Sequence, residues 1–144
     1  MDEQDRTQAS QQQPVYTAAD LVIAALSQVE NLTVEDVAEE LASSDVLLVD
    51  LRELDERADL GVIPGSTHAP RGMLEFHADS NLPYHIAGFE PARRTILYCS
   101  DGARSALAVL TLRSMGYSDL AHLAGGMSAW MDERRPVEDV SQPS

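Results

Sequence analysis

The sequence predicts an α/β domain, in which a parallel β-sheet is flanked by helices on both faces. Short, mainly apolar runs without alternation occupy residues 46–49, 95–98 and 120–123, and such runs are typical of strands buried on both faces. Stretches with helical periodicity separate these runs along the chain, as expected for strand–helix–strand units. In sheets of this kind, functional sites lie outside the carboxyl ends of the strands.

Two helices are predicted ahead of the first strand. Thr17 and Thr33 are each followed three positions later by an aspartate, Asp20 or Asp36, a pattern that caps the start of a helix. Apolar residues then recur at helical spacing. Because both helices have an apolar face that needs cover, we expect both to pack on the domain. The polar residues 1–14 before them predict a flexible tail.

The remaining elements complete a single domain that we place at residues 15–136, including the two N-terminal helices. After the first strand we expect, in order, a charged helix over 51–59, a turn at 63–66, a short strand at 67–69, one or two helical turns over 71–78, a surface connection over 81–91, a helix over 104–115, a turn at 125–126 and a last helix over 127–134. The helix over 104–115 should face inward through Leu107, Ala108, Leu110, Thr111 and Met115. The acidic residues 137–144 predict a flexible C-terminal tail.

Charge and composition exclude several classes of function. With a formal net charge of -14, the surface repels nucleic-acid phosphates and anionic lipids, so we expect neither nucleic acid nor a membrane as a partner. An anionic substrate would need a local positive potential at its site. No segment approaches the roughly 20 apolar residues that cross a bilayer, and the polar N-terminus is unlike a signal sequence. We therefore predict a cytoplasmic protein.

The single cysteine and the four histidines limit the chemistry further. One cysteine cannot form an intramolecular disulfide, and it suits a reducing compartment. The histidines show no spacing typical of metal ligands, and the chain has neither a phosphate-binding glycine loop nor a dinucleotide fingerprint. The sequence therefore predicts no metal and no cofactor.

The strongest candidate site is the segment that follows the strand at 95–98. It has the order strand–Cys–x–x–Gly–x–Arg–helix, although a lone cysteine is by itself more often a buried core residue. A helix N-terminus and the inward N–H groups of a tight loop favour an anion, and Gly102 allows the backbone that such a loop requires. The thiolate is the reactive form of cysteine, whose pKa is ordinarily about 8.5. We therefore predict that Cys99 is a nucleophile, in a substrate-binding loop formed by Ser100, Asp101, Gly102, Ala103, Arg104 and Ser105.

Three further charged residues each have two interpretations. Asp50 ends the first strand, at the same rim of the sheet as Cys99, and either supports the site or forms a cap or turn there. Arg52 either supports the site or pairs on the surface with the acidic residues that follow it. Asp101 either weakens the binding of an anionic donor or points outward and caps the helix.

Four motifs span most of the predicted domain, from about residue 46 to residue 130. They are Leu48-Val49-Asp50-Leu51-Arg52, Gly61-Val62-Ile63-Pro64-Gly65-Ser66, Tyr98-Cys99-Ser100-Asp101-Gly102-Ala103-Arg104-Ser105 and Leu123-Ala124-Gly125-Gly126-Met127-Ser128-Ala129-Trp130. In this order and spacing they resemble the rhodanese superfamily of sulfurtransferases, in its bacterial single-domain form. One departure is Val62, at a position where the family often has a histidine.

The resemblance implies a rhodanese-like fold with a parallel five-stranded sheet, and a catalytic cysteine that alternates between thiolate and persulfide. Cys99 would attack the outer sulfur of a donor such as thiosulfate, release sulfite, and pass the sulfur to cyanide or a thiol. The loop N–H groups would stabilise the developing charge, and Arg104 would orient the loop and help to hold the donor. The protein would then be a thiosulfate sulfurtransferase.

Two alternative functions remain open. A persulfide carrier or sensor would act with a partner protein that accepts the sulfur, and residues 71–91, with His77 and His85, are its candidate docking surface. A cysteine-dependent phosphatase or arsenate reductase on this fold would use Cys–x5–Arg, whereas here four residues separate Cys99 from Arg104. The shorter loop favours a single reactive sulfur over a tetrahedral oxyanion.

Overall fold

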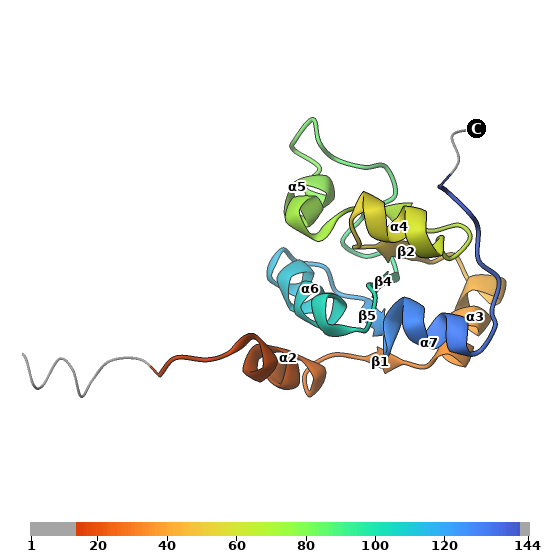
Figure 1. Cartoon of the computed structure of the whole chain (residues 1–144). Helices are drawn as coiled ribbons and strands as arrows, with labels where there is room; N and C mark the ends of the chain where they lie inside the picture. Colours follow the sequence, from red (N-terminus) through yellow and green to blue (C-terminus); the bar gives the residue numbers. More distant parts are fainter. Residues whose placement is uncertain (1–13, 142–144) are drawn as a thin grey trace, which may run out of the picture.

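A computed structural model describes residues 14–141 and confirms the predicted α/β fold (Figure 1). Its five parallel strands have the order β1-β5-β4-β2-β3, so the expected five-stranded parallel sheet is also confirmed. The strands are β1 (Asn31–Leu32), β2 (Leu47–Asp50), β3 (Thr67–His68), β4 (Thr95–Tyr98) and β5 (Leu120–Leu123). The predicted N-terminal tail, apart from Pro14, lies outside the described residues.

Helices cover both faces of the sheet, as predicted. The helices are α2 (Ala18–Leu26), α3 (Val34–Ser43), α4 (Leu54–Leu60), α5 (Leu74–Ala78), α6 (Ala103–Ser114) and α7 (Gly126–Asp132), with a 3-10 turn at Arg71–Met73. Helices α5 and α6 pack on one hydrophobic cluster, and α3 and α7 pack on the other. The carboxyl ends of β4 and β5 lead directly into the N-termini of α6 and α7 (Figure 1).

Side chains along the central strands alternate between these two clusters, because successive residues of a strand point to opposite faces. On β4, Tyr98 belongs to the cluster under α3 and α7, whereas Cys99, which follows it, belongs to the cluster under α6. On β5, Ala121 and Leu123 face α3 and α7, so His122 between them points toward α6. Cys99 and His122 therefore lie on the same face of the sheet.

Both predicted N-terminal helices form, and both begin with the capping box that the sequence indicated. The Thr17 hydroxyl accepts the N–H of Asp20 at 3.0 Å, and the Asp20 carboxylate accepts the N–H of Thr17 at 2.9 Å. The Thr33–Asp36 pair repeats this arrangement. Between the two helices the structure contains β1, a strand of two residues that the sequence did not predict.

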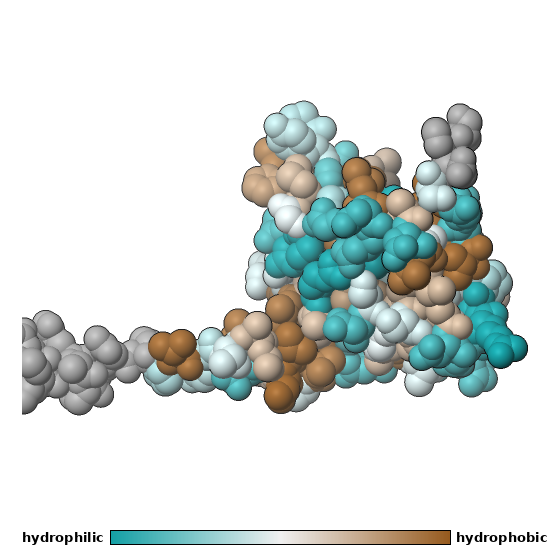
Figure 2. Space-filling view, in the orientation of Figure 1, coloured by the Kyte–Doolittle hydropathy of each residue, from teal (hydrophilic) through white to brown (hydrophobic). Residues whose placement is uncertain are grey.

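Both of these helices pack on the domain, as expected, but α2 buries fewer of its residues than α3. Helix α3 buries Val34 and Val37 in the core, whereas Ala25 is the one fully buried residue of α2. Helix α2 contacts α6 and leaves its outer face in solvent, with Leu21 51% and Ile23 68% exposed. Figure 2 shows hydrophobic residues gathered over α2, at the lower left of the molecule.

The inward face of α6 differs from the predicted one. Its buried residues are Ser105, Ala106, Ala108, Val109 and Leu112. Of the five residues expected there, Ala108 is buried, and the other four are half-buried. Four of the five buried side chains, all except Leu112, are small, and α6 lies close against β4 and β5.

The first residues of the predicted C-terminal tail are held against the domain. Val62 and Glu138 form an antiparallel bridge through two backbone hydrogen bonds of 2.9 Å each. The indole N–H of Trp130 donates to the carbonyl of Pro136 at 2.8 Å, just before this bridge. Among residues 14–141, no helix combines the length and the apolar character that a membrane span requires.

Candidate active site

Cys99 lies in the loop that joins β4 to α6, at the carboxyl edge of the sheet. Its sulfur accepts the backbone N–H of Gly102 at 3.2 Å and that of Ser105 at 3.4 Å. Gly102 has a φ of +97°, in the left-handed region that favours glycine, and this conformation turns the loop around the sulfur. The sulfur of a fully buried cysteine is thus surrounded by backbone donors, an arrangement that stabilises a sulfur anion.

The N-terminus of α7 supports this loop from behind. The N–H groups of Met127 and Ser128 donate to the carbonyls of Cys99 and Ser100 at 2.8 Å and 3.0 Å. This approach requires glycine at position 126, because a Cβ there would lie 2.7 Å from the carbonyl carbon of Ser100. The second glycine of the Gly-Gly turn therefore allows α7 to fix the position of the loop backbone.

Arg104, the predicted donor-binding residue, is paired with Glu56 of α4. Its two terminal nitrogens donate to the two carboxylate oxygens of Glu56 at 2.8 Å and 2.7 Å, and the Ser100 hydroxyl donates to the same carboxylate at 2.8 Å. These bonds, above all those from Arg104, lower the pKa of Glu56 to about 2, against the opposing effect of burial. The charge of Arg104 is thus compensated within the site.

Sequence reasoning missed Glu56 as a site residue and placed it on the surface as one of the acidic residues that follow Arg52. It lies 48 positions from Arg104 in the chain, so no local spacing could connect the two. The available signal was the cluster of acidic residues in the short helix after β2, which the fold brings to the same edge of the sheet.

Asp101 points outward and caps α6, which is one of its two expected roles. Its carboxylate accepts the N–H of Ala103, the first residue of the helix, at 3.0 Å, and its side chain is exposed. The negative charge of Asp101 therefore lies at the outer surface of the loop rather than beside the sulfur.

Asp50 and Arg52 form a buried ion pair on the face opposite to Cys99. Both side chains are fully buried, and Arg52 donates to the two carboxylate oxygens of Asp50 at 3.0 Å and 2.9 Å. The Tyr98 hydroxyl and Arg57 donate to the same carboxylate at 3.0 Å and 3.1 Å. The expectation that Asp50 shares the rim with Cys99 is met, but side-chain alternation directs it to the other face.

The surface pairing considered for Arg52 is wrong. Its guanidinium also donates to the carbonyl of Gly61 at 2.8 Å and lies 5.5 Å from the centre of the Tyr98 ring. Burial opposes the charged form of Arg52, but the hydrogen bonds and charge of Asp50 outweigh it and raise the pKa of Arg52. The pair joins β2 to the segment that leads into β3, so it supports the edge of the sheet.

A chain of polar side chains extends behind Cys99. The Ser105 hydroxyl oxygen lies 3.6 Å from the Cys99 sulfur and 2.8 Å from Nδ1 of His122. Nε2 of His122 lies 2.6 Å from Oδ1 of Asn31 on β1. The sequence analysis considered His122 only as a metal ligand. Its signal was a single polar side chain inside the apolar run 120–123.

A metal site is not evident in the part of the chain that the structure describes. Among residues 14–141, no group of three or more histidine, cysteine, aspartate and glutamate side chains is arranged to hold a metal ion. The functional groups gathered at Cys99 are a thiol, backbone donors, a hydroxyl and an imidazole, and these are suited to nucleophilic chemistry at sulfur.

Comparison with known proteins assigns this arrangement to a family. The family model of the rhodanese-like domain matches residues 33–133. A protein from Allochromatium vinosum, described as a sulfurtransferase, is 32% identical over 110 residues, which are 76% of this chain and 94% of that protein.

Two solved structures are also similar. One, a protein of unknown function from Rhodopseudomonas palustris described as a possible tyrosine phosphatase, is 39% identical with a TM-score of 0.81, over 88% of this chain and 98% of that one. The other, the polysulfide-sulfur transferase homodimer from Wolinella succinogenes, is 30% identical with a TM-score of 0.69, over 85% of this chain and 87% of that one.

The buried pair predicts a large effect of Asp50 on stability. We expect Asp50→Asn to lower the free energy of unfolding by about 3–5 kcal/mol, because it leaves the buried charge of Arg52 without its partner. Chemical denaturation measures this loss. A stable variant with a slower reaction at Cys99 would instead indicate that Asp50 acts in the site.

The Gly126 position predicts a coupled loss of stability and loop geometry. We expect Gly126→Ala to cost about 2 kcal/mol or more, because the residue has a φ of +58° and its new methyl group would displace the loop carbonyls. Gly72→Ala is the matched control, because no atom lies within 4 Å of its added methyl group. Thermal melting measures both variants, and equal melting temperatures would contradict this explanation.

The Arg104–Glu56 pair predicts a defined pH window. The pKa of Glu56 is near 4.5 when unfolded and about 2 when folded, so its contribution to stability is complete above pH 4.5 and is lost as the pH falls toward 2. At pH 6 we expect Glu56→Gln to be less stable by about 0.5–1 kcal/mol, a modest value because the pair is about one-third exposed. Denaturation of both proteins across this range should show the difference shrinking toward acid pH. A difference that is independent of pH would exclude this charge effect.

Proposed function

The chain belongs to the rhodanese-like domain family of sulfurtransferases, and we propose that it moves a sulfane sulfur through a persulfide on Cys99. The donor is an anion of the thiosulfate type, and the acceptor is cyanide or a thiol. The observation that carries this proposal is the position of the Cys99 sulfur, which accepts the N–H groups of Gly102 and Ser105 in a loop at the helix N-terminus.

The proposed reaction has two displacements at sulfur. The Cys99 thiolate attacks the outer sulfur of thiosulfate, the S–S bond of the donor breaks, and sulfite leaves with the bonding electron pair. A cyanide ion or a thiolate then attacks the outer sulfur of the persulfide, and Cys99 leaves as a thiolate. A single cysteine is sufficient, because the covalent intermediate is carried on one sulfur.

Positive potential for an anionic donor comes in this site mainly from the backbone. Arg104 is the cationic side chain in the loop, and Glu56 compensates its charge. The N–H groups around the sulfur have no such compensation, and they stabilise the charge that develops on the sulfur during each displacement. The net charge of -14 makes this local source necessary.

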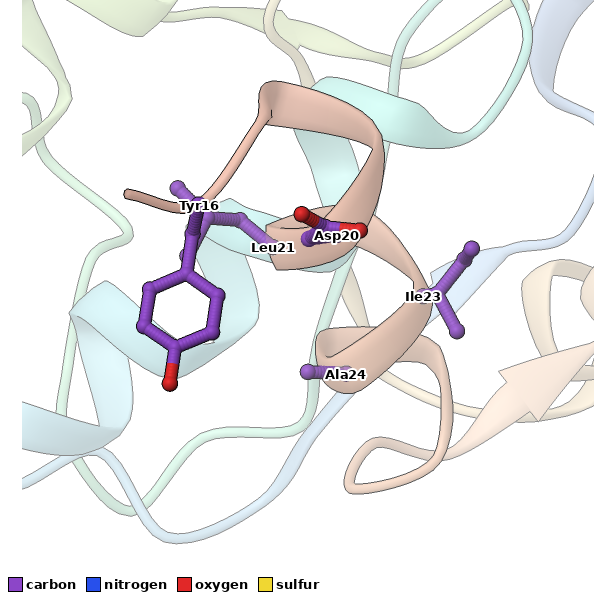
Figure 3. A pocket seen from close by; sticks show the side chains of 5 residues that line it. All are labelled: Tyr16, Asp20, Leu21, Ile23 and Ala24. Atoms are coloured by element: carbon purple, nitrogen blue, oxygen red, sulfur yellow. The ribbon is translucent and has the colours of Figure 1, made fainter. Parts of the chain in front are cut away.

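A second candidate function, a persulfide carrier that serves a protein partner, is favoured by the outer face of α2. Tyr16, Leu21 and Ile23 line one pocket on this face (Figure 3). Val22 and Leu26 of the same helix line a groove that reaches the active-site loop. The polysulfide-sulfur transferase of W. succinogenes is a homodimer, so a second copy of this chain is one candidate for this face.

This face differs from the docking surface expected at residues 71–91. In that segment, His77 bonds the carbonyl of Tyr84 at 2.8 Å and His85 bonds that of Phe89 at 3.0 Å. These two histidines therefore hold the connection in shape. The variant Ile23→Asp tests the outer face of α2. Because a charge on that face would weaken both a homodimer and a complex with a protein acceptor, light scattering should show less dimer, or sulfur transfer to a protein thiol should be slower.

The proposed function predicts activity that depends on Cys99. With thiosulfate and cyanide, we expect the wild type to form thiocyanate, and intact mass spectrometry after thiosulfate alone should show a gain of about 32 Da, one sulfur atom. We expect Cys99→Ser to lose both signals, because an alcohol cannot form the persulfide.

Three outcomes separate the candidates. A mass gain without thiocyanate would favour the carrier, because sulfur is then loaded but cyanide does not accept it. Neither signal with thiosulfate would overturn thiosulfate as the donor, and polysulfide would be the next donor to test. Turnover of an aryl phosphate that depends on Cys99 would favour the phosphatase that the description of the R. palustris protein suggests.

A further inference from the structure

We propose that His122 is a positioning residue that takes up the proton of the Cys99 thiol through Ser105, and that it thereby promotes the thiolate. The inference rests on the proposed function in one respect, because it gives a catalytic role only if Cys99 is the nucleophile. It stands on three consecutive contacts, of 3.6 Å from Cys99 to Ser105, 2.8 Å from Ser105 to His122 and 2.6 Å from His122 to Asn31.

The first step of the argument is the orientation of the Asn31 amide. Its nitrogen donates to the carbonyls of Leu26 and Val29 at 2.9 Å and 3.1 Å, which uses both amide hydrogens. The amide oxygen must then face His122, at 2.6 Å from Nε2. Because this oxygen can only accept, Nε2 of His122 carries a hydrogen.

The second step follows for a neutral imidazole, which has one hydrogen. With Nε2 protonated, Nδ1 has a free lone pair and accepts the Ser105 hydroxyl at 2.8 Å. The hydroxyl has one other carbonyl in reach, that of Gly102, but at the longer distance of 3.3 Å. The lone pairs of the Ser105 oxygen are then available to the thiol hydrogen of Cys99.

The resulting chain runs in one direction, from the thiol through the hydroxyl to Nδ1. Along it, the S–H bond of Cys99 breaks and its proton joins the Ser105 oxygen, while the hydroxyl proton of Ser105 moves to Nδ1 of His122. The products are a thiolate, a neutral serine that now donates to the sulfur, and an imidazolium. No oxidant, reductant or further reactant is needed.

The surroundings of His122 fit a base that is neutral at rest. Burial lowers the pKa of His122, which favours the neutral ring at rest, and the thiolate formed beside it then supplies the countercharge for the imidazolium. Asp101 is the charged residue among those that line a groove of about 380 Å³ with His122, beside α2. The remaining lining is uncharged, and on β1 the ring meets the neutral amide of Asn31. The thiolate and Asp101 are thus the negative charges available to an imidazolium here.

The test measures the pH at which Cys99 becomes reactive. The chain has a single cysteine, so the rate of iodoacetamide addition, followed by intact mass, reports this residue alone. We expect His122→Asn and Ser105→Ala to raise the pH midpoint of alkylation by about one unit, because the thiolate loses its countercharge. His85→Asn is the matched control, since His85 bonds the Phe89 carbonyl in the segment 71–91, and its midpoint should equal that of the wild type.

A folded His122→Asn variant with the same midpoint as the wild type would overturn the relay, whatever its melting temperature. If His122→Asn does not fold, His122→Gln takes its place, because Ser105→Ala also removes the hydroxyl that donates to the thiolate and does not test His122 by itself. Alkylation needs no turnover, so this result is separate from the proposed function. If the wild type forms the persulfide but the His122 variant shows no shift in its alkylation midpoint, only the relay is overturned. If the midpoint shifts but the wild type transfers no sulfur, only the proposed reaction is overturned.

Discussion

The alternation of side chains along β4 is the constraint on which the rest of the site depends. Consecutive residues of a strand point to opposite faces, so Tyr98 and Cys99 enter separate environments although they are neighbours in the chain. Tyr98 joins the buried pair of Asp50 and Arg52, which holds the edge of the sheet. Cys99 points to the α6 face, where its sulfur contacts the N–H groups of a short loop and the Ser105 hydroxyl, which in turn contacts His122 of β5. Side-chain alternation on one strand thus separates the buried ion-pair network around Tyr98 from the candidate active site around Cys99.

Much of the fold could be predicted because its information is local. Continuous apolar runs identified β2, β4 and β5, and two threonine–aspartate pairs marked the starts of α2 and α3. Strand β1 has two residues between capped helices, which is too short for any periodicity. The inward face of α6 was misjudged because small buried residues such as Ser105 and Ala106 give no hydrophobic pattern that separates them from exposed positions.

The candidate site divides in the same way between local and long-range information. The loop from Cys99 to Ser105 could be predicted, because strand, glycine and arginine stand at short spacings that determine its geometry. Glu56 and Asn31 could not be, because each meets its partner across long stretches of chain. Asp50 was placed at the correct rim, but its face depends on the register with β4, which the sequence alone does not contain.

Two groups of polar side chains lie near Cys99: Ser105 with His122, and Arg104 with Glu56 and Ser100. In the proposed reaction the negative charge occupies two different sulfur atoms in turn. The sulfur attacks as a thiolate and later leaves as a thiolate, and in both states its charge lies next to Ser105, in front of His122. In the persulfide, the charge moves to the outer sulfur, one bond beyond the Cys99 sulfur. Arg104 is the cationic side chain of the loop, and Glu56 and Ser100 hold it in a fixed and nearly neutral cluster. An arginine without a carboxylate partner would bind the anionic sulfite product as well as the donor, whereas one paired with Glu56 orients the loop without retaining the product. Support of the thiolate by Ser105 and His122, together with a restrained arginine charge in the loop, therefore suits a reaction in which anions both enter and leave.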